Sequence, residues 1–440
     1  MTENASTMQA VHGFHPATKL YRFTILLFVS LLTLGTYFAY DMIAAISGDL
    51  MNQFGADQSN IGLINTMYSV AAILAVFFGG MLLDRLGTRK ASILFSTTVV
   101  VGAAIVAFAK TLLLVYIGRF VFGAGSETLI VAQSTILARW FKGKELALSF
   151  GIALTVSRIG SLFAFNTGTV IRDHYGGVFY ALLAATIICF LSLMANLAYI
   201  VLDRRGERIL KLKDGSAEDR IILKDIKEFK PSFWFVTALC VTFYSAVFPF
   251  QTLAVQFFQE KWVIPDIAAE SGSFISKALF NLFHMFNTAG GITAIVIFAS
   301  MILAPFAGRM VDKWGKRATV MIFGSLLLIV SHLTLGLTKL HPVLSMIVLG
   351  AAFVLVPAAL WPSIPLVVPK ERVGTAFGLM TAIQNVGFAV FNPLNGKLRA
   401  ITGSYTSSEI MFASLGIVGL IFAFLLRRAD KRADGVLEKP

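Results

Sequence analysis

The sequence GMLLDRLGTRK, residues 80–90, recurs as GRMVDKWGKR at residues 308–317. Both copies close the second apolar run of a set of six and lead into the third run. Turns that only set topology would explain the arginines and lysines, but not the glycine and aspartate spacing that the copies share. The repeat therefore predicts a duplicated chain with two related halves and a central pathway between them.

Each repeated position has a physical interpretation. The first glycine (Gly80, Gly308) allows a neighbouring helix to approach closely, and the second (Gly87, Gly315) forms a tight turn. The aspartate between them (Asp84, Asp312) is placed where it can face the N-terminus of a helix.

Apolar runs long enough to cross a bilayer fill most of the chain. Of its 440 residues, 57% are hydrophobic and 14% are charged, whereas soluble proteins average about 25% charged residues. The composition predicts an integral membrane protein. The twelve predicted membrane helices are 23–47, 59–83, 91–109, 111–137, 146–171, 177–202, 232–259, 289–311, 318–338, 342–368, 373–398 and 405–426.

The basic residues are unevenly distributed between the two sides. If both termini lie on one side, most of the 37 Lys and Arg residues lie there too. The positive-inside rule then places both termini in the cytoplasm, and the net charge of +13 needs no nucleic-acid partner. The predicted organisation is a cytoplasmic tail (1–22), a six-helix bundle (23–202), a cytoplasmic linker (203–231), a second six-helix bundle (232–427) and a cytoplasmic tail (428–440).

The sequence carries no pattern typical of a catalytic, metal or cofactor site. Cys189 and Cys240 lie inside apolar runs, and His284 and His332 have no partners at metal-ligand spacing. No nucleophile and base are paired in or beside the apolar runs. We therefore expect neither an enzyme nor a bound metal or cofactor.

The repeated loop pattern resembles that of the major facilitator superfamily, whose transporters rock between states open to opposite sides. The resemblance implies an all-α integral membrane fold of twelve transmembrane helices in two pseudo-symmetric six-helix bundles. It implies that Asp84, beside Arg85, and also Asp312 hold the cytoplasmic side closed when the other side is open. Arg119 fits the family's fourth-helix Arg-x-x-x-Gly pattern, with a role in coupling or gating or as a buried hydrogen-bond anchor.

Two charges interrupt the apolar runs around the turn at 139–145. Glu127 lies twelve residues before Arg139, and Arg158 lies thirteen residues after Glu145. At ~1.5 Å rise per residue, both lie roughly 18–20 Å from the same face, near the bilayer midplane. An acid and a base at matched depth on adjacent helices favour a binding site for a zwitterion, the alternative being a purely structural ion pair.

Further motifs resemble one branch of the superfamily, a group of lysosomal dipeptide transporters. They are WFKGKEL at 140–146, SRIGS at 157–161 and WPSIPLVVP at 361–369. In that branch an acidic residue and an arginine clasp the two peptide termini, so the resemblance assigns these roles to Glu127 and Arg158. It implies a secondary transporter that moves small zwitterionic peptides by alternating access, as a facilitated uniporter.

Six other residues are candidates for the site. Asp41, a candidate proton-titrating group together with Glu127, lies near the outer mouth of a cavity or is an interfacial acid. Tyr40 precedes it, and Tyr244 and Trp361 either line the cavity or pack within the protein. Prolines beside Trp361 should kink or break its helix. Gln384 and Asn385 would supply polar contacts from the second bundle.

The likeness to the lysosomal branch is incomplete. The N-terminal tail lacks an acidic dileucine-type sorting signal, and the only Asn-x-Ser/Thr sequence, at Asn4, lies in that tail. We therefore predict a bacterial cytoplasmic membrane rather than a lysosomal one. The expected partners are a dipeptide and the lipid bilayer; an accessory subunit is not favoured, and a monomer is expected.

Two alternatives to a peptide carrier stay open. In an organic-anion or other small-metabolite carrier, proton-coupled or not, Arg119 and Arg158 would jointly hold a carboxylate or phosphate, with Glu127 as counter-ion. In a membrane receptor or assembly subunit, the fold would serve without transport. Uptake of a labelled dipeptide into liposomes separates both carriers from the receptor.

Overall fold

The computed structural model describes residues 14–141, 145–210, 229–267, 272–369, 372–432 and 435–439. Within these ranges, the side chains of five residues are not described, namely Phe77, Asp84, Leu146, Ala147 and Asp312. Asp84 and Asp312, the repeated aspartates, therefore lie outside the described side chains. Most of the predicted cytoplasmic linker (203–231) also lies outside the description, since residues 211–228 are not included.

The described chain is helical throughout, and twelve of its segments are long and apolar enough to cross a membrane. The helices of the N-terminal bundle are α1 (Lys19–Ala45), α2 (Ser47–Phe54), α3 (Gln58–Ala107), α4 (Leu112–Phe141), α5 (Leu146–Tyr175) and α6 (Val178–Leu210). Those of the C-terminal bundle are α7 (Pro231–Trp262), α8 (Phe274–Phe283), η2 (Met285–Asn287), α9 (Ala289–Trp314), α10 (Arg317–Leu337), α11 (Pro342–Val367), α12 (Val373–Thr402) and α13 (Thr406–Arg432). Helices predominate because lipid offers no partner for a backbone N–H or C=O group.

Local sequence signals explain where several helices begin. Asp57 forms a capping box with Asn60 at the start of α3, and Thr288 caps α9 through the backbone N–H of Gly291. Pro231 and Pro342 stand in the first turns of α7 and α11, where a missing N–H costs nothing. The boundary predicted at residue 202 differs from the structure, because α6 continues to Leu210.

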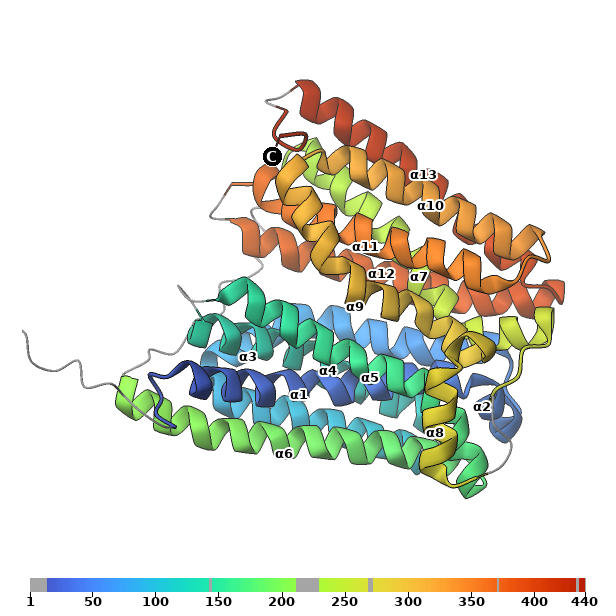
Figure 1. Ribbon diagram of the computed structural model, residues 1–440, viewed down its shortest axis with the longest axis horizontal. Coiled ribbons are helices and arrows are strands. Elements are labelled where there is room, and N and C mark those ends of the chain that lie inside the picture. Colours follow the sequence, from blue (N-terminus) through green and yellow to red (C-terminus); the bar gives the residue numbers. More distant parts are fainter. Residues whose placement is uncertain are drawn as a thin grey trace, which may run out of the picture.

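The two bundles diverge toward the face where α1 begins and α6 and α13 end, which we call the terminal face (Figure 1, left). On the other side, the opposite face, they touch. A Cβ added at Gly62 would lie 2.4 Å from the carbonyl oxygen of Asn392, and one at Gly290 would lie 2.1 Å from that of Phe165. Three glycines near the terminal face have no other described atom within 4 Å of such a Cβ, namely Gly80, Gly151 and Gly308. The bundles are therefore closed together at the opposite face.

The repeated loops contain the tight turns that the sequence predicted. Gly87 is the non-helical residue inside α3, with φ 73° and ψ 161°, and it lies between the span Gln58–Val76 and the rest of the helix to Ala107. Gly315 ends α9 with φ 63°. Positive φ favours glycine because it lacks a Cβ atom. The close helix approach predicted at Gly80 and Gly308 is wrong for this conformation, because both lie where the bundles diverge.

Two other segments show where helices continue and where they begin. The α11 helix runs without interruption from Pro342 to Val367 and includes Pro357, Pro362 and Pro365, so the prolines do not break it. The segment after α7 contains the separate helix α8, which crosses the end of the spans at the opposite face (Figure 1). An N-cap at Ser273 starts this helix, and α9 begins after it at Ala289.

The C-terminal tail is docked onto the C-terminal bundle rather than free. Leu437 is fully buried, and its carbonyl oxygen accepts from the backbone N–H of Arg317 at 2.8 Å. The carboxylate of Glu438 accepts from both the backbone N–H and the hydroxyl of Thr319. These contacts cap α10, whose own N-cap residue, Lys316, makes no side-chain cap hydrogen bond.

Candidate functional site

Glu127 on α4 and Arg158 on α5 are two charges of the N-terminal bundle, and Arg158 reaches a ring of the C-terminal bundle. Both side chains are half-buried. Tyr68 on α3 donates its hydroxyl to Glu127 Oε1 at 2.6 Å. Among the described residues, no ion pair joins Glu127 to Arg158, so the structural-ion-pair alternative does not hold in this conformation.

Arg158 lies between two aromatic rings that belong to different bundles. Its guanidinium carbon is 5.0 Å from the ring centre of Tyr37 on α1 and 5.6 Å from that of Phe353 on α11. No hydrogen bond from the guanidinium to a described residue is present. A half-buried guanidinium held by ring faces retains its donors for an external acceptor.

Asp41 lies inside the bundle and not at its edge. It is buried, with 6% of its surface exposed, and lies beside Ser161 within electrostatic range of Arg158 and Arg119. An interfacial acid would instead be exposed to water. Its neighbour Tyr40 stacks edge-on with Tyr68 and lies under the guanidinium of Arg119.

Arg119 is buried, and its two terminal nitrogens are already occupied. Nη2 donates to Asn65 Oδ1 at 2.9 Å, and Nη1 donates to the carbonyl oxygen of Ala39 at 3.4 Å. The rings of Tyr40, Tyr68 and Phe122 surround its guanidinium. Arg119 is therefore a hydrogen-bond anchor between helices in this conformation, and its buried Nε has no acceptor among the described residues.

The C-terminal bundle faces Arg158 with a cluster of aromatic rings. Trp361 Nε1 donates to the hydroxyl of Tyr244 at 2.9 Å, and Tyr244 packs edge-on against Phe353. Phe248 contacts both Phe353 and Phe388. We call these five residues the aromatic wall. It brings Tyr244 and Trp361 together, as a shared site requires, from α7 and α11.

Gln384 and Asn385 have different hydrogen-bond partners and do not share a contact in the described part of the chain. Gln384 accepts a weak hydrogen bond from Cys240 Sγ on α7 at 3.5 Å. Asn385 is buried and donates to the carbonyl oxygen of Thr381 in its own helix. Among the described residues, no hydrogen bond or ring contact joins either residue to the aromatic wall.

Sequence reasoning missed Tyr68, Phe353 and Tyr37, which contact the two central charges directly. Tyrosines and phenylalanines are frequent in membrane helices, so their type alone does not mark a site. The packing of α3 on α4 brings Tyr68 to Glu127, and the contacts of α5 with α1 and α11 bring Tyr37 and Phe353 to Arg158.

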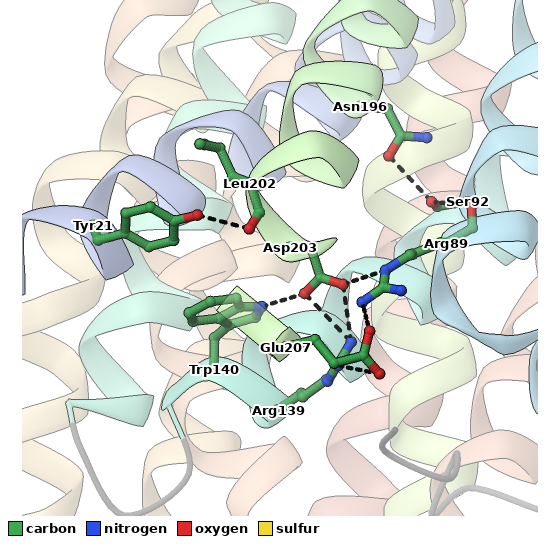
Figure 2. Close-up of polar contacts among 9 residues, drawn as sticks. All are labelled: Tyr21, Arg89, Ser92, Arg139, Trp140, Asn196, Leu202, Asp203 and Glu207. Carbon is green, nitrogen blue, oxygen red and sulfur yellow. Dashed lines mark hydrogen bonds and ion pairs between the residues drawn. The ribbon is translucent and has the colours of Figure 1, made fainter. Parts of the chain in front are cut away.

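A second charged cluster lies within the N-terminal bundle near the terminal face (Figure 2). The fully buried Asp203 accepts from Arg89 Nε at 2.6 Å, from Arg139 Nη1 at 3.1 Å and from Trp140 Nε1 at 2.7 Å. Glu207 pairs with both arginines from one turn further along α6. This cluster joins α3, α4 and α6 on the side where the bundles diverge. Asp203 had been placed in the linker by sequence, so its role was not anticipated.

His332 has a partner that the sequence did not indicate. Its Nδ1 lies 2.8 Å from Glu409 Oε2, and both side chains are buried between α10 and α13. The pair had no signal in sequence because 77 residues separate its members. Within the described residues, no group of three or more His, Cys, Asp or Glu side chains could hold a metal ion.

Comparison with known proteins gives concordant results. The Major Facilitator Superfamily model matches residues 29–276 and 263–439. The chain is 34% identical over 431 residues to the Lysosomal dipeptide transporter MFSD1 of Homo sapiens, covering 94% of this chain and 88% of that protein. It is 33% identical over 438 residues to the protein of the same name from Danio rerio, covering 96% and 90%. A crystal structure of a mutant of the nucleoside transporter NupG is similar in fold alone, with TM-score 0.68, 13% identity and coverage of 91% and 99%.

Proposed function

The chain belongs to the major facilitator superfamily, and from that premise we propose that this transporter carries small zwitterionic peptides by alternating access. Glu127 would bind the peptide's ammonium group, and Arg158 its carboxylate. The observation that supports this proposal most is that both charges are half-buried and, among the described residues, do not pair with one another. The relatives' name, which describes a dipeptide transporter, agrees with it.

The charge balance of the site also favours a zwitterion. Two arginines, Arg119 and Arg158, and two acids, Asp41 and Glu127, contribute formal charges that cancel. A ligand with no net charge leaves this balance intact, whereas a buried unpaired charge is costly. The anion-carrier alternative needs Arg119 and Arg158 to act together, but Arg119 already donates to Asn65 and Ala39.

The aromatic wall suits a carrier that tolerates many side chains. Dipeptides share their charged termini but differ in side chains. Charge-assisted bonds at Glu127 and Arg158 would supply the common affinity. Ring faces from the C-terminal bundle, such as Phe353, would contact varied side chains without demanding one hydrogen-bond pattern.

Three finer points belong to the same proposal. We propose that the terminal face is cytoplasmic, by the positive-inside rule. We propose facilitated uniport, with Asp41 and Glu127 as the groups to examine for proton coupling. The prediction of a bacterial cytoplasmic membrane receives no support from the relatives, whose names describe lysosomal proteins.

The test compares a free dipeptide with the same dipeptide blocked at one end. In the unmodified protein, N-acetylation and C-terminal amidation should each weaken binding, as measured by thermal shift and by competition with labelled peptide uptake into liposomes. Glu127→Gln should abolish the penalty of N-acetylation but retain that of amidation. Arg158→Gln should do the reverse.

If both variants lose affinity equally for the free, the N-acetylated and the amidated dipeptide, the assignment of one terminus to each charge would be contradicted. Binding and uptake that survive Glu127→Gln unchanged, with competition by dicarboxylates, would support the anion carrier instead. Peptide binding without uptake would identify a receptor.

A further inference from the structure

Two buried polar side chains connect the bundles beneath the opposite face. Asn65 Nδ2 on α3 donates to Thr252 Oγ1 on α7 at 3.0 Å, and each residue is 3% exposed. The Thr252 hydroxyl in turn donates to Asn392 Oδ1 on α12 at 2.8 Å. Because these groups are buried, separating the bundles leaves donors and acceptors without partners, which is costly in a low-dielectric interior.

The same asparagine is bound to the candidate site. Its Oδ1 accepts from Arg119 Nη2 at 2.9 Å, so both ends of its amide are engaged. The guanidinium of Arg119 lies 5.4 Å from the ring centre of Tyr68, whose hydroxyl donates to Glu127. Direct contacts therefore run without a gap from the acid of the site to the C-terminal bundle. In order, the residues are Glu127, Tyr68, Arg119, Asn65, Thr252 and Asn392.

We propose that the Asn65–Thr252 hydrogen bond is the contact through which occupancy of Glu127 controls closure of the opposite face. The inference rests on the proposed function, because the occupant is the ammonium group of a peptide. That group competes with the Tyr68 hydroxyl for the carboxylate of Glu127. The ammonium group also adds positive charge on the face of α4 that carries both Glu127 and Arg119.

Both effects weaken the hold of Arg119 on Asn65. The side-chain amide of Asn65 binds both Arg119 and Thr252. A rotation of this amide that breaks its hydrogen bond with Arg119 therefore also distorts its hydrogen bond with Thr252. A ligand shifts a conformational equilibrium only through different affinities for the two states. Here the difference arises because the closed state requires the arrangement of Tyr68 and Arg119 that the ammonium group disturbs.

The chain offers a matched control beside this contact. Thr66, the next residue on α3, also crosses between the bundles and donates to the carbonyl oxygen of Ala389 at 3.1 Å. Among the described residues, no hydrogen bond joins it to Arg119 or Tyr68. Thr66→Val and Thr252→Val therefore remove the same group from the same interface, but only Thr252 continues the path from the site.

The experiment measures the opposite face with nitroxide labels at Gln53→Cys and Ser404→Cys, two exposed positions, one on each bundle. Pulsed electron paramagnetic resonance in lipid nanodiscs gives the ratio of open to closed states. Loss of the Thr252 hydroxyl should raise this ratio roughly threefold to tenfold without ligand, as expected for one buried hydrogen bond. Thr252→Ser, which keeps the hydroxyl, should stay within about twofold of the unsubstituted protein.

Coupling is read from double substitutions without ligand. Tyr68→Phe removes the hydroxyl that binds Glu127. Combined with Thr252→Val, its effect on the ratio should differ from the product of the single effects by roughly threefold or more. Combined with Thr66→Val, the effects should multiply. Multiplication in both cycles, or a Thr252→Ser protein that behaves like Thr252→Val, would overturn the proposal.

The ligand arm uses glycyl-alanine as the probe. In the unsubstituted and Thr66→Val proteins, saturating peptide should raise the ratio of open to closed states. The Thr252→Val protein should bind the peptide, but its ratio of open to closed states should not change further. An undiminished peptide response in Thr252→Val would overturn the inference. If glycyl-alanine binds none of the proteins, the proposed function fails, and the ligand-free cycles still decide whether Asn65 and Thr252 are coupled to the site.

Discussion

Asp203→Asn should lower the free energy of unfolding by roughly 3–5 kcal/mol, the usual cost of breaking a buried ion pair. The carboxylate is fully buried and receives three donors, from Arg89, Arg139 and Trp140 (Figure 2). Asparagine has nearly the same shape but one acceptor oxygen and two N–H donors. Asparagine therefore removes the negative charge nearest Arg139, whose side chain is 2% exposed. It also points its own N–H group at the N–H groups of Arg89, Arg139 or Trp140.

The assay is reversible unfolding in mixed micelles of increasing sodium dodecyl sulfate fraction, followed by tryptophan fluorescence. Glu207→Gln is the matched control, because it makes the same chemical change against the same two arginines. The Glu207 side chain is 36% exposed, so its loss should cost only about 0–1 kcal/mol. Equal losses in the two variants, or a loss below about 1 kcal/mol for Asp203→Asn, would refute the reasoning that burial determines the cost.

Two further predictions concern the opposite face. Gly62→Ala places a Cβ 2.4 Å from the carbonyl oxygen of Asn392, so liposome uptake should fall at least roughly tenfold, whereas Gly151→Ala, in open space, should change it less than about twofold. Similar uptake in both variants would contradict this. Burial raises the pKa of Asp266 above its ordinary 3.8, and Arg172 offsets this only in part. Stability from such a group is present below the ordinary pKa and lost as pH rises through the raised value. The Asp266→Asn protein should therefore have a higher melting temperature than the unsubstituted protein at about pH 7, and the same melting temperature at about pH 3. A lower melting temperature of the variant at about pH 7 would show that ionised Asp266 does not destabilise the protein.

The fold could be predicted because its determinants are local. Apolar runs of membrane length form helices wherever they occur, since lipid leaves the backbone no other partner. The turns at Gly87 and Gly315 follow from the spacing of the repeat. The structure differs where local signals were incomplete: α6 continues past residue 202, and the prolines of α11 do not break their helix, whereas the kink remains a prediction. The division into bundles at the predicted residues remains a prediction.

The candidate site was predicted only as a set of residues. Glu127 and Arg158 drew attention because charge is rare inside an apolar run. Their roles, and those of Asp41, Tyr40, Gln384 and Asn385, remain predictions, as do those of the repeated aspartates. The sequence also left the role of Arg119 open, and the structure identifies its hydrogen bonds to Asn65 and Ala39.

The sequence by itself determined the membrane class, the twelve spans, the internal repeat and the presence of unpaired charges in two neighbouring helices, because hydropathy and charge act residue by residue. Only the tertiary structure decided which side chains meet. Asn65 and Thr252 are 187 positions apart, and Arg158 reaches Phe353 across the bundle boundary. Such contacts depend on how whole helices pack, and helix packing is a property of all the facing side chains together, so no single stretch of sequence encodes it.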